Sequence, residues 1–140
     1  MAGVTIDILR QLLPTHDIVR YDNSTQHVTL RDGSVLCVWS YRQSASAQSC
    51  ASALERLNGD SAVPALCAAD VAGRLCGTAF VVGTAPRGQM LAHAGIGMSH
   101  DQRYAIGQQL GQMVARWHAL TYAGFGALND ATHKIGRAHV

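Results

Sequence analysis

Cysteine and histidine are the side chains in this sequence best suited to nucleophilic, redox or metal chemistry. The four cysteines are far apart and include no C-x-x-C pair, and the seven histidines show neither H-x-x-x-H nor H-E-x-x-H spacing. No metal site is therefore predicted. An even number of cysteines indicates disulfides mainly where a secretory signal accompanies it. Because the N-terminal stretch MAGVTIDILRQLL lacks the basic-then-apolar layout of such a signal, we expect buried, reduced thiols in a cytoplasmic protein.

Composition limits the classes of partner that this chain can have. It has 140 residues, of which 48% are hydrophobic and 14% are charged, with a formal net charge of +2. That composition suits one folded domain or part of a larger one. Lysine and arginine are scattered without a basic run, which argues against a dedicated nucleic-acid surface. Since no apolar stretch approaches the roughly 18 residues of a membrane span, we expect neither nucleic acid nor a membrane as a partner.

The spacing of apolar residues predicts a mixed order of helices and strands. Helical spacing that begins at Ile6 ends at Pro14, and Asp32-Gly33 between two β-forming runs predicts a hairpin. Ser99 with Gln102 three residues later predicts a capping box at the start of a long helix. The predicted order is a helix, three strands, a helix, two strands, a loop and a long helix. The ranges are 6–13, 18–21, 26–30, 34–39, 44–57, 63–68, 78–82 and 99–120.

Four stretches within this order resemble the aminoglycoside phosphotransferase and choline kinase-like family, whose members are ATP-dependent small-molecule kinases. They are YDNSTQHVTLRDGSVLCVW, AVPALCAAD, GTAFVVGTAPRGQML and LGQMVARWHALTYAGFGAL. The resemblance covers residues 4–128. It implies an α+β fold, the protein-kinase-like small lobe, in which an antiparallel sheet of about five strands and a helix are followed by the first helix of the large lobe.

The same resemblance implies how the chain is divided. Residues 1–92 would form the N-terminal lobe with its hinge, and residues 93–134 would begin a truncated large lobe. The final stretch IGRAHV, at residues 135–140, resembles the translation of a sequencing-adapter end. We expect it to be a non-native tail, with an ordinary polar tail as the alternative. The family's catalytic loop, a His-Gly-Asp run with a following Asn, has no counterpart in this chain, so no catalytic residue is assigned.

The resemblance also implies where ATP would bind. A turn between the first two strands would lie over the phosphates, and a hinge would offer backbone groups to the adenine edge. The turn residues are Asn23, Ser24, Thr25 and Gln26. The hinge residues are Val82, Gly83 and Thr84, and the hinge extends to Ala85. Val38 or Val82 would sandwich the adenine ring.

In the family, a Lys or Arg on the third strand contacts the phosphates, and a Glu on the next helix orients it. Here Cys37 stands at the basic position and Cys50 at the Glu position. Loss of both charges together avoids leaving one buried charge unpaired, which indicates an atypical nucleotide site. Two alternatives stay open. In another register, Arg31 or Arg42 would contact the phosphates. Alternatively, the two thiols would form a disulfide, but the Cα atoms of the family's Lys and Glu positions usually lie too far apart for one.

Three interpretations of the chain follow from this sequence. The first is a fragment of an ATP-dependent small-molecule phosphotransferase: the nucleotide-binding lobe only, inactive alone. The complete enzyme would use magnesium and would act on a small hydroxyl-bearing substrate. The alternative is a non-catalytic, degenerate kinase-like module that binds a nucleotide or a partner. The third is an unrelated small α+β domain.

Overall fold

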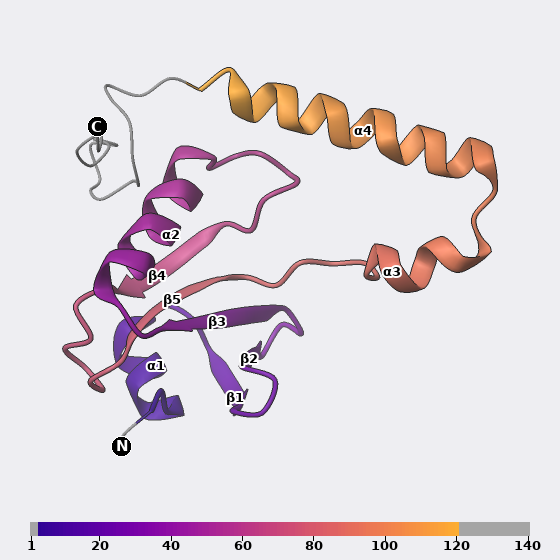
Figure 1. Cartoon of the computed structure of the whole chain (residues 1–140). Coiled ribbons are helices and arrows are strands. Elements are labelled where there is room, and N and C mark those ends of the chain that lie inside the picture. Colours follow the sequence, from indigo (N-terminus) through magenta and orange to yellow (C-terminus); the bar gives the residue numbers. More distant parts are fainter. Residues whose placement is uncertain (1–2, 121–140) are drawn as a thin grey trace, which may run out of the picture. The chain divides into compact units, whose positions relative to one another are not determined.

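The computed structural model describes residues 3–120, and these form an α+β fold. The order of the predicted helices and strands is confirmed, and a short helix and a 3-10 turn follow the last strand where a loop was predicted (Figure 1). The elements are α1 (Ile6–Leu12), β1 (Ile18–Asp22), β2 (His27–Leu30), β3 (Val35–Tyr41), α2 (Ser44–Arg56), β4 (Leu66–Asp70), β5 (Ala79–Thr84), α3 (Leu91–Ala94), η1 (Gly95–Gly97) and α4 (His100–His118).

The described residues fall into two compact units, which we call unit 1 (residues 3–85) and unit 2 (residues 86–120). Unit 1 holds the sheet with α1 and α2, and unit 2 holds α3, η1 and α4. The division predicted after residue 92 falls inside α3. The predicted tail at 135–140 lies outside the described residues.

The sheet of unit 1 has five antiparallel strands in the order β1-β2-β3-β5-β4. The strands β1, β2 and β3 form two successive hairpins, whereas β5 enters between β3 and β4. Helix α2 connects β3 to β4, so the chain crosses over the sheet once before β4 and β5 pair. Strand β5, which lies between β3 and β4, is buried along nearly its whole length, and this explains its continuous apolar sequence AFVV.

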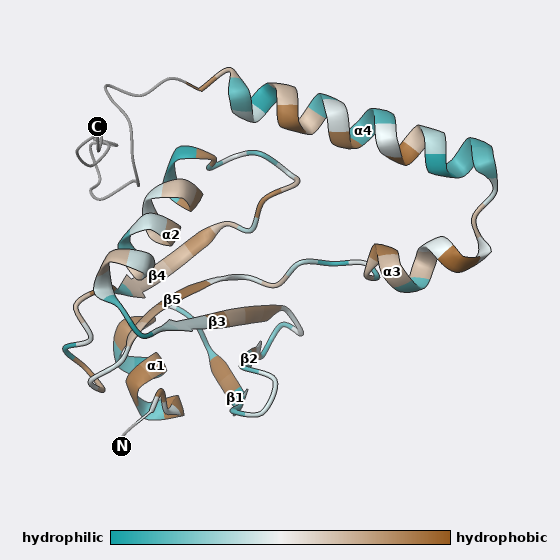
Figure 2. Cartoon of the chain, viewed as in Figure 1, coloured by the Kyte–Doolittle hydropathy of each residue, from teal (hydrophilic) through white to brown (hydrophobic). Residues whose placement is uncertain are grey.

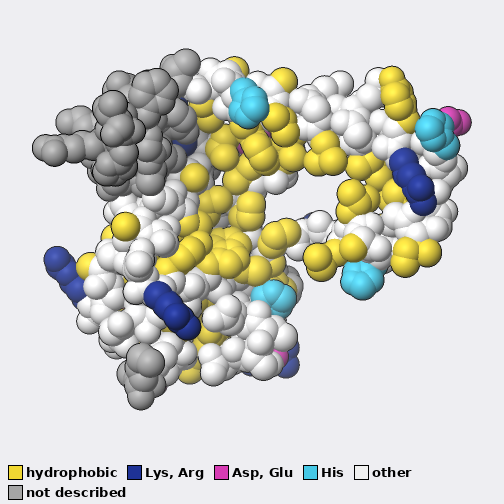
Figure 3. Space-filling view, viewed as in Figure 1, with side chains coloured by type: hydrophobic (Ala, Val, Ile, Leu, Met, Phe, Trp, Pro, Cys, Tyr) yellow, Lys and Arg dark blue, Asp and Glu magenta, His cyan; other side chains and the backbone are white. Residues whose placement is uncertain are grey.

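Two cores form because alternate residues of a strand point to opposite faces of the sheet. On the face covered by α1, Leu9 packs with Val28, Val38, Phe80 and Val82. On the other face, Ala47 and Ala51 of α2 pack with Ala79 and Val81. We call these the α1 face and the α2 face. Figure 1 shows the two helices on opposite sides of the sheet, and Figure 3 shows hydrophobic side chains gathered over the middle of unit 1.

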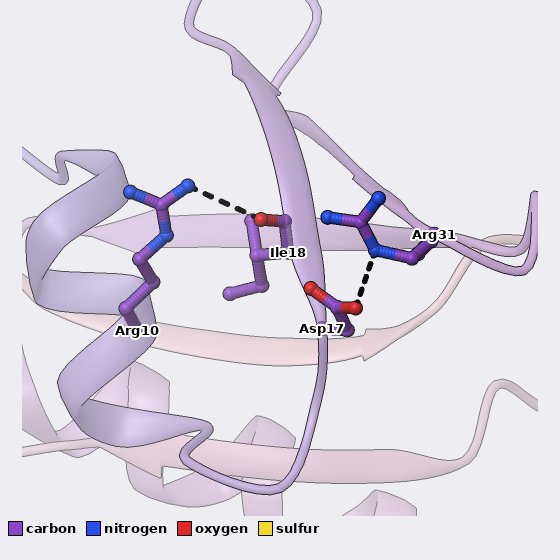
Figure 4. Close-up of polar contacts among 4 residues, drawn as sticks. All are labelled: Arg10, Asp17, Ile18 and Arg31. Carbon is purple, nitrogen blue, oxygen red and sulfur yellow. Dashed lines mark hydrogen bonds and ion pairs between the residues drawn. The ribbon is translucent and has the colours of Figure 1, made fainter.

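Polar contacts attach α1 and the β2–β3 turn to the start of β1 (Figure 4). The Arg10 guanidinium donates to the Ile18 carbonyl oxygen over 3.2 Å. The Arg31 Nε atom lies 2.6 Å from an Asp17 carboxylate oxygen. Since both side chains of this ion pair are mostly exposed, it contributes at most about 1 kcal/mol to stability.

Unit 2 is dominated by α4, whose start is a complete capping box, as predicted. The Ser99 hydroxyl accepts from the Gln102 N–H over 3.2 Å, and the Gln102 side chain accepts from the Ser99 N–H over 2.9 Å. The helix is largely hydrophilic with separate apolar bands (Figure 2), and Leu110 and Val114 are exposed. Among residues 3–120, none of the helices combines the length and the apolar character that a membrane span requires.

Candidate functional site

The register of the sheet brings the predicted site residues Cys37 and Gly83 into one row with Asp22 and His27 on the α2 face. Asp22 pairs with His27, His27 pairs with Cys37, and Cys37 pairs with Gly83. Directly paired residues of neighbouring strands point to the same face. The row therefore crosses β1, β2, β3 and β5 and joins the predicted phosphate turn to the predicted hinge.

Cys37 lies on the α2 face of the sheet, whereas Cys50 belongs to α2 itself, and the two thiols have different neighbours. Cys37 is 8% exposed, and burial raises the pKa of its thiol. Cys50 packs beside Tyr41, whose pKa is raised to about 12, mainly by burial and then by a hydrogen bond with Cys50. Both cysteines are free thiols. Two thiols therefore stand where the family has a Lys–Glu ion pair, and Cys50 forms a hydrogen bond with Tyr41.

The turn between β1 and β2 folds its hydrogen-bond donors onto its own carboxylate. The Asp22 carboxylate accepts from the Ser24 N–H over 3.0 Å and from the Ser24 hydroxyl over 2.7 Å. These bonds from Ser24, with further ones from Thr25, lower the pKa of Asp22. Gln26 has a φ of 58°, and its carbonyl oxygen accepts from the Val38 N–H over 2.9 Å. The N–H and hydroxyl groups of Ser24 therefore donate to the Asp22 carboxylate, at the place where the resemblance puts a phosphate.

The predicted hinge residues Val82, Gly83 and Thr84 all belong to β5, and they point to different faces. Val82 is fully buried on the α1 face, as is Val38, because both alternate with the residues of the row. The two valines that were expected against the adenine ring therefore lie on the face opposite Cys37. Gly83 is the hinge residue that shares the α2 face with Cys37.

The backbone donors at the end of β5 are already bonded within unit 1. The Thr84 N–H donates to the Ala65 carbonyl oxygen over 3.0 Å, and the Ala85 N–H donates to the Val35 carbonyl oxygen over 3.0 Å. The Thr84 hydroxyl oxygen accepts from the Ala65 N–H over 2.8 Å. An adenine edge would have to use groups beyond Ala85 or displace these bonds.

Trp39 is a second aromatic feature of this face. It pairs with Val81, two residues along β3 from Cys37, and packs against the α2-face core. A Cβ atom at Gly83 would lie only 2.7 Å from the Trp39 Cζ3 atom. The indole thus covers the backbone of Gly83 and leaves no room for a side chain there.

Three residues on this face were missed by the sequence analysis: Arg20, His27 and Trp39. Arg20 pairs with Thr29, one row from the Asp22–Gly83 row, and both Arg20 and His27 are exposed. Alternation from Cys37 along the predicted strand would have identified Trp39. Arg20 could not be found that way, because the pairing of β1 shifts by one residue between Ile18 and Arg20.

The charges on the α2 face do not favour phosphates. Cys37 and Gly83 are buried and Trp39 is half-buried, whereas Asp22 places a negative charge beside the turn. Arg20 is the cationic side chain of β1 to β5 on this face. Within residues 3–120, no three His, Cys, Asp or Glu side chains come together as a metal site would require.

Unit 2 contains a separate apolar groove of about 430 Å³. It is lined by α3, η1 and α4, with Leu91, Ile96, Ile106 and Leu110 among its walls. Arg103 is its charged residue, and the Arg103 guanidinium donates to the Gly95 carbonyl oxygen over 3.1 Å. The groove therefore offers apolar surface without an acid–base or nucleophilic group.

Comparison with known proteins adds no relative of this chain. No protein-family model, no curated protein and no solved structure matches it.

Proposed function

We propose that unit 1 is the nucleotide-binding lobe of an ATP-dependent small-molecule phosphotransferase of the aminoglycoside phosphotransferase-like kind. The observation that carries the proposal is the position of α2. This helix lies between β3 and β4 in the chain and packs on the face of the sheet that also carries Cys37 and Gly83. The family resemblance places the phosphate-contacting residue and its orienting partner on that strand and that helix.

The chemistry of phosphoryl transfer is consistent with a lobe that holds the nucleotide but has no catalytic residue. Such transfer depends mainly on positioning and charge neutralisation. On the α2 face, Gly83 and Trp39 provide the apolar side of the site, and Arg20 and His27 provide polar groups near the turn. Magnesium and the small hydroxyl-bearing acceptor would be held by other parts of the complete enzyme.

Titration calorimetry with Mg-ATP tests this proposal on the full chain and on Cys37→Lys/Cys50→Glu. The chain as it stands should bind weakly, because its third strand has no cation. The double variant should bind about tenfold to a hundredfold more tightly, since a hydrogen bond to a charged group is worth about 1.5–3 kcal/mol. Cys37→Lys alone should gain less, because an unpartnered ammonium pays a desolvation penalty.

Cys67→Lys is the matched control. Cys67 packs toward the α1 face, so this substitution adds the same charge on the other side of the sheet. It should leave Mg-ATP affinity unchanged. An equal gain in the control would mean that charge alone, and not this site, attracts the nucleotide. No gain in the double variant beyond the two single variants would contradict the assigned positions.

A non-catalytic module is the second candidate, and the Asp22 turn favours it. The carboxylate occupies the donors that would otherwise meet a phosphate. A module of this kind should bind adenosine, ADP and Mg-ATP with similar affinity. A phosphotransferase lobe should prefer Mg-ATP, and an unrelated α+β domain should bind none of the three.

A further inference from the structure

We propose that the apolar groove of unit 2 binds a small organic acid whose carboxylate is attached to an apolar chain, as in a medium-chain fatty acid. The groove lies among α3, η1 and one face of α4 and has a volume of about 430 Å³. Arg103 would bind the carboxylate, and the apolar chain would lie along Ile106 and Leu110. This site is separate from the proposed nucleotide site, because all of its residues belong to unit 2.

The residues that α4 contributes to the groove run from a charged end to an apolar end. Arg103, Ile106, Gly107 and Leu110 follow one another at helical spacing, so they share one face of the helix. At a rise of 1.5 Å per residue, Arg103 and Leu110 are separated by roughly 10 Å along the helix axis. A ligand with an anionic head and an apolar tail matches this order of groups.

Arg103 has hydrogen-bond donors left for a ligand. Its guanidinium donates to the Gly95 carbonyl oxygen over 3.1 Å, which holds the side chain beside η1. Within residues 3–120, the guanidinium makes no other hydrogen bond and no ion pair. A guanidinium has five N–H donors, and a carboxylate can accept two of them in parallel. The charged end of the groove therefore suits a carboxylate.

The apolar walls of the groove are open to solvent. Leu91 is 53% exposed, Ile96 81% and Leu110 45%, and none of residues 86–120 is buried. A ligand chain that covers these side chains removes apolar surface from water, and this favours binding. The volume of the groove lies within the roughly 300–1,000 Å³ of small-molecule sites, which are likewise mostly apolar with a few polar groups.

Gly107 leaves space in the groove. Glycine inside a helix is less favourable than every residue except proline. A Cβ atom at Gly107 would meet nothing within 4 Å, and Gly107 is not among the glycines with positive φ. Neither close packing nor backbone conformation therefore requires a glycine here. Its missing side chain leaves room beside Ile106 and Leu110 for the chain of a ligand.

The charges of unit 2 favour a separate acid over a second copy of this chain as the occupant. Residues 86–120 contain Arg87, Arg103 and Arg116 but a single acidic residue, Asp101. Another copy of unit 2 would thus bring few carboxylates to Arg103, whereas a fatty acid carries one at the end of its chain.

Decanoate is the probe for this site, with calorimetry and methyl NMR of the full chain as the measurements. Saturating decanoate should shift the methyl signals of Ile96, Ile106 and Leu110 and leave those of Val19, which is exposed on unit 1, unchanged. Octanoate, which is two methylenes shorter, should bind up to about tenfold more weakly. Arg103→Gln should weaken decanoate binding about threefold to fivefold, as for an exposed charge contact, and should leave decanol binding unchanged.

Gly107→Leu places a side chain in the groove and should weaken decanoate binding at least about tenfold. The helix should remain folded, because leucine is a better helix former than glycine. Gly111→Leu is the matched control and should bind decanoate as the parent does. A Cβ atom at Gly111 also meets nothing within 4 Å, but Gly111 does not line the groove.

Three results would overturn the proposal. The first is equal decanoate affinity in Gly107→Leu and Gly111→Leu, and the second is an equal loss of decanoate and decanol binding in Arg103→Gln. The third is self-association of the parent that Gly107→Leu abolishes, without any binding of decanoate, which would assign the groove to a second copy. None of these results depends on Mg-ATP binding by unit 1, so the proposed function is tested separately.

Discussion

Ala65 and Thr84 are joined by two hydrogen bonds, and each residue donates its N–H group in one of them. The Thr84 N–H donates to the Ala65 carbonyl oxygen over 3.0 Å, and the Ala65 N–H donates to the Thr84 hydroxyl over 2.8 Å. The end of β5 is thereby attached to the residue before β4. This connection fixes the place where the chain leaves the sheet, next to Gly83 and Trp39.

Replacing Thr84 by Val should destabilise this corner of unit 1. The Ala65 N–H would lose its acceptor, so the free energy of unfolding should fall by about 1 kcal/mol. Thr84→Ser keeps the hydroxyl and should lose less than half as much. Urea unfolding of the three proteins measures the difference. Equal stability of Thr84→Val and the parent would show that solvent replaces the hydroxyl without cost.

Two turns of the sheet contain the same aspartate–serine arrangement and can serve as each other's control. The Asp22 carboxylate accepts the N–H and hydroxyl of Ser24, and the Asp32 carboxylate accepts those of Ser34 over 2.9 and 2.6 Å. The pKa values of both aspartates are lowered, chiefly by these serine bonds. Ser24→Ala should return the pKa of Asp22 toward its ordinary value and leave Asp32 unchanged, and Ser34→Ala should do the reverse.

Carbon-detected NMR titration of the carboxylates from pH 2 to pH 6 measures both pKa values in one sample. A lowered pKa means that each aspartate contributes stability above the unfolded value of about 3.9, and that this contribution is lost as the pH falls through the folded value. The serine variants should therefore lose less stability on acidification than the parent. A shift of both aspartates in either single variant would contradict the pairing.

Burial of thiols should make the protein less stable at alkaline pH. The pKa values of Cys37 and Cys67 are raised by burial. Each folded thiol therefore keeps its proton at a pH at which the unfolded chain has lost it. This contribution is complete below the unfolded pKa of about 8.5 and is lost as the pH rises through the folded value.

The free energy of unfolding should accordingly decrease between pH 7.5 and pH 9, where tyrosines with a pKa of about 10 are still almost fully protonated. Cys37→Ala should make this decrease shallower, and Cys37→Ala/Cys67→Ala should make it shallower still. Urea unfolding at three pH values measures the slope. An unchanged slope in the double variant would assign the alkaline loss to other groups.

The capping box of α4 should stabilise the first turn of that helix. Ser99→Ala removes the acceptor of the Gln102 N–H and should cost about 1 kcal/mol locally. Ser99→Asp keeps an acceptor and should retain most of the protection. Hydrogen exchange of the first helical amides provides the measurement, with amides near Arg116 as the internal reference. Faster exchange at both ends would indicate loss of the whole helix rather than of its cap.

Arg20 should contribute to the binding of phosphates and not of the base. It lies on the α2 face of β1, near the turn. Arg20→Gln should weaken Mg-ATP binding about threefold to tenfold, as for a partly screened charge contact, and should leave adenosine binding unchanged. Arg31→Gln is the control, because Arg31 is paired with Asp17 at the β2–β3 turn. Equal losses in the two variants would show a general effect of net charge.

Much of the fold follows from local patterns along the chain. The Asp32-Gly33 turn, the capping box at Ser99 and Gln102, and the helical spacing that begins at Ile6 each act within a few residues, so their elements appear where they were predicted. The short helix α3 and the turn η1 were missed, since Leu91–Gly97 is too short and too glycine-rich to show a helical period. The predicted end of the fifth strand at residue 82 was two residues early, because Gly83 and Thr84 continue to pair with β3 and Gly83 also pairs with β4.

The composition of the candidate site depended on contacts between distant parts of the chain. Sequence alone identified Cys37 and Gly83, but not that they pair across β3 and β5 or that Trp39 covers Gly83. The bulge in β1 turns Arg20 onto the α2 face, and alternation turns Val38 and Val82 away from it. Sequence alone determined the five strands and the helices α1, α2 and α4, because turn and capping signals are local. Only the tertiary structure decided which side chains share a face, because strand register is set by pairing and by core packing across the whole sheet.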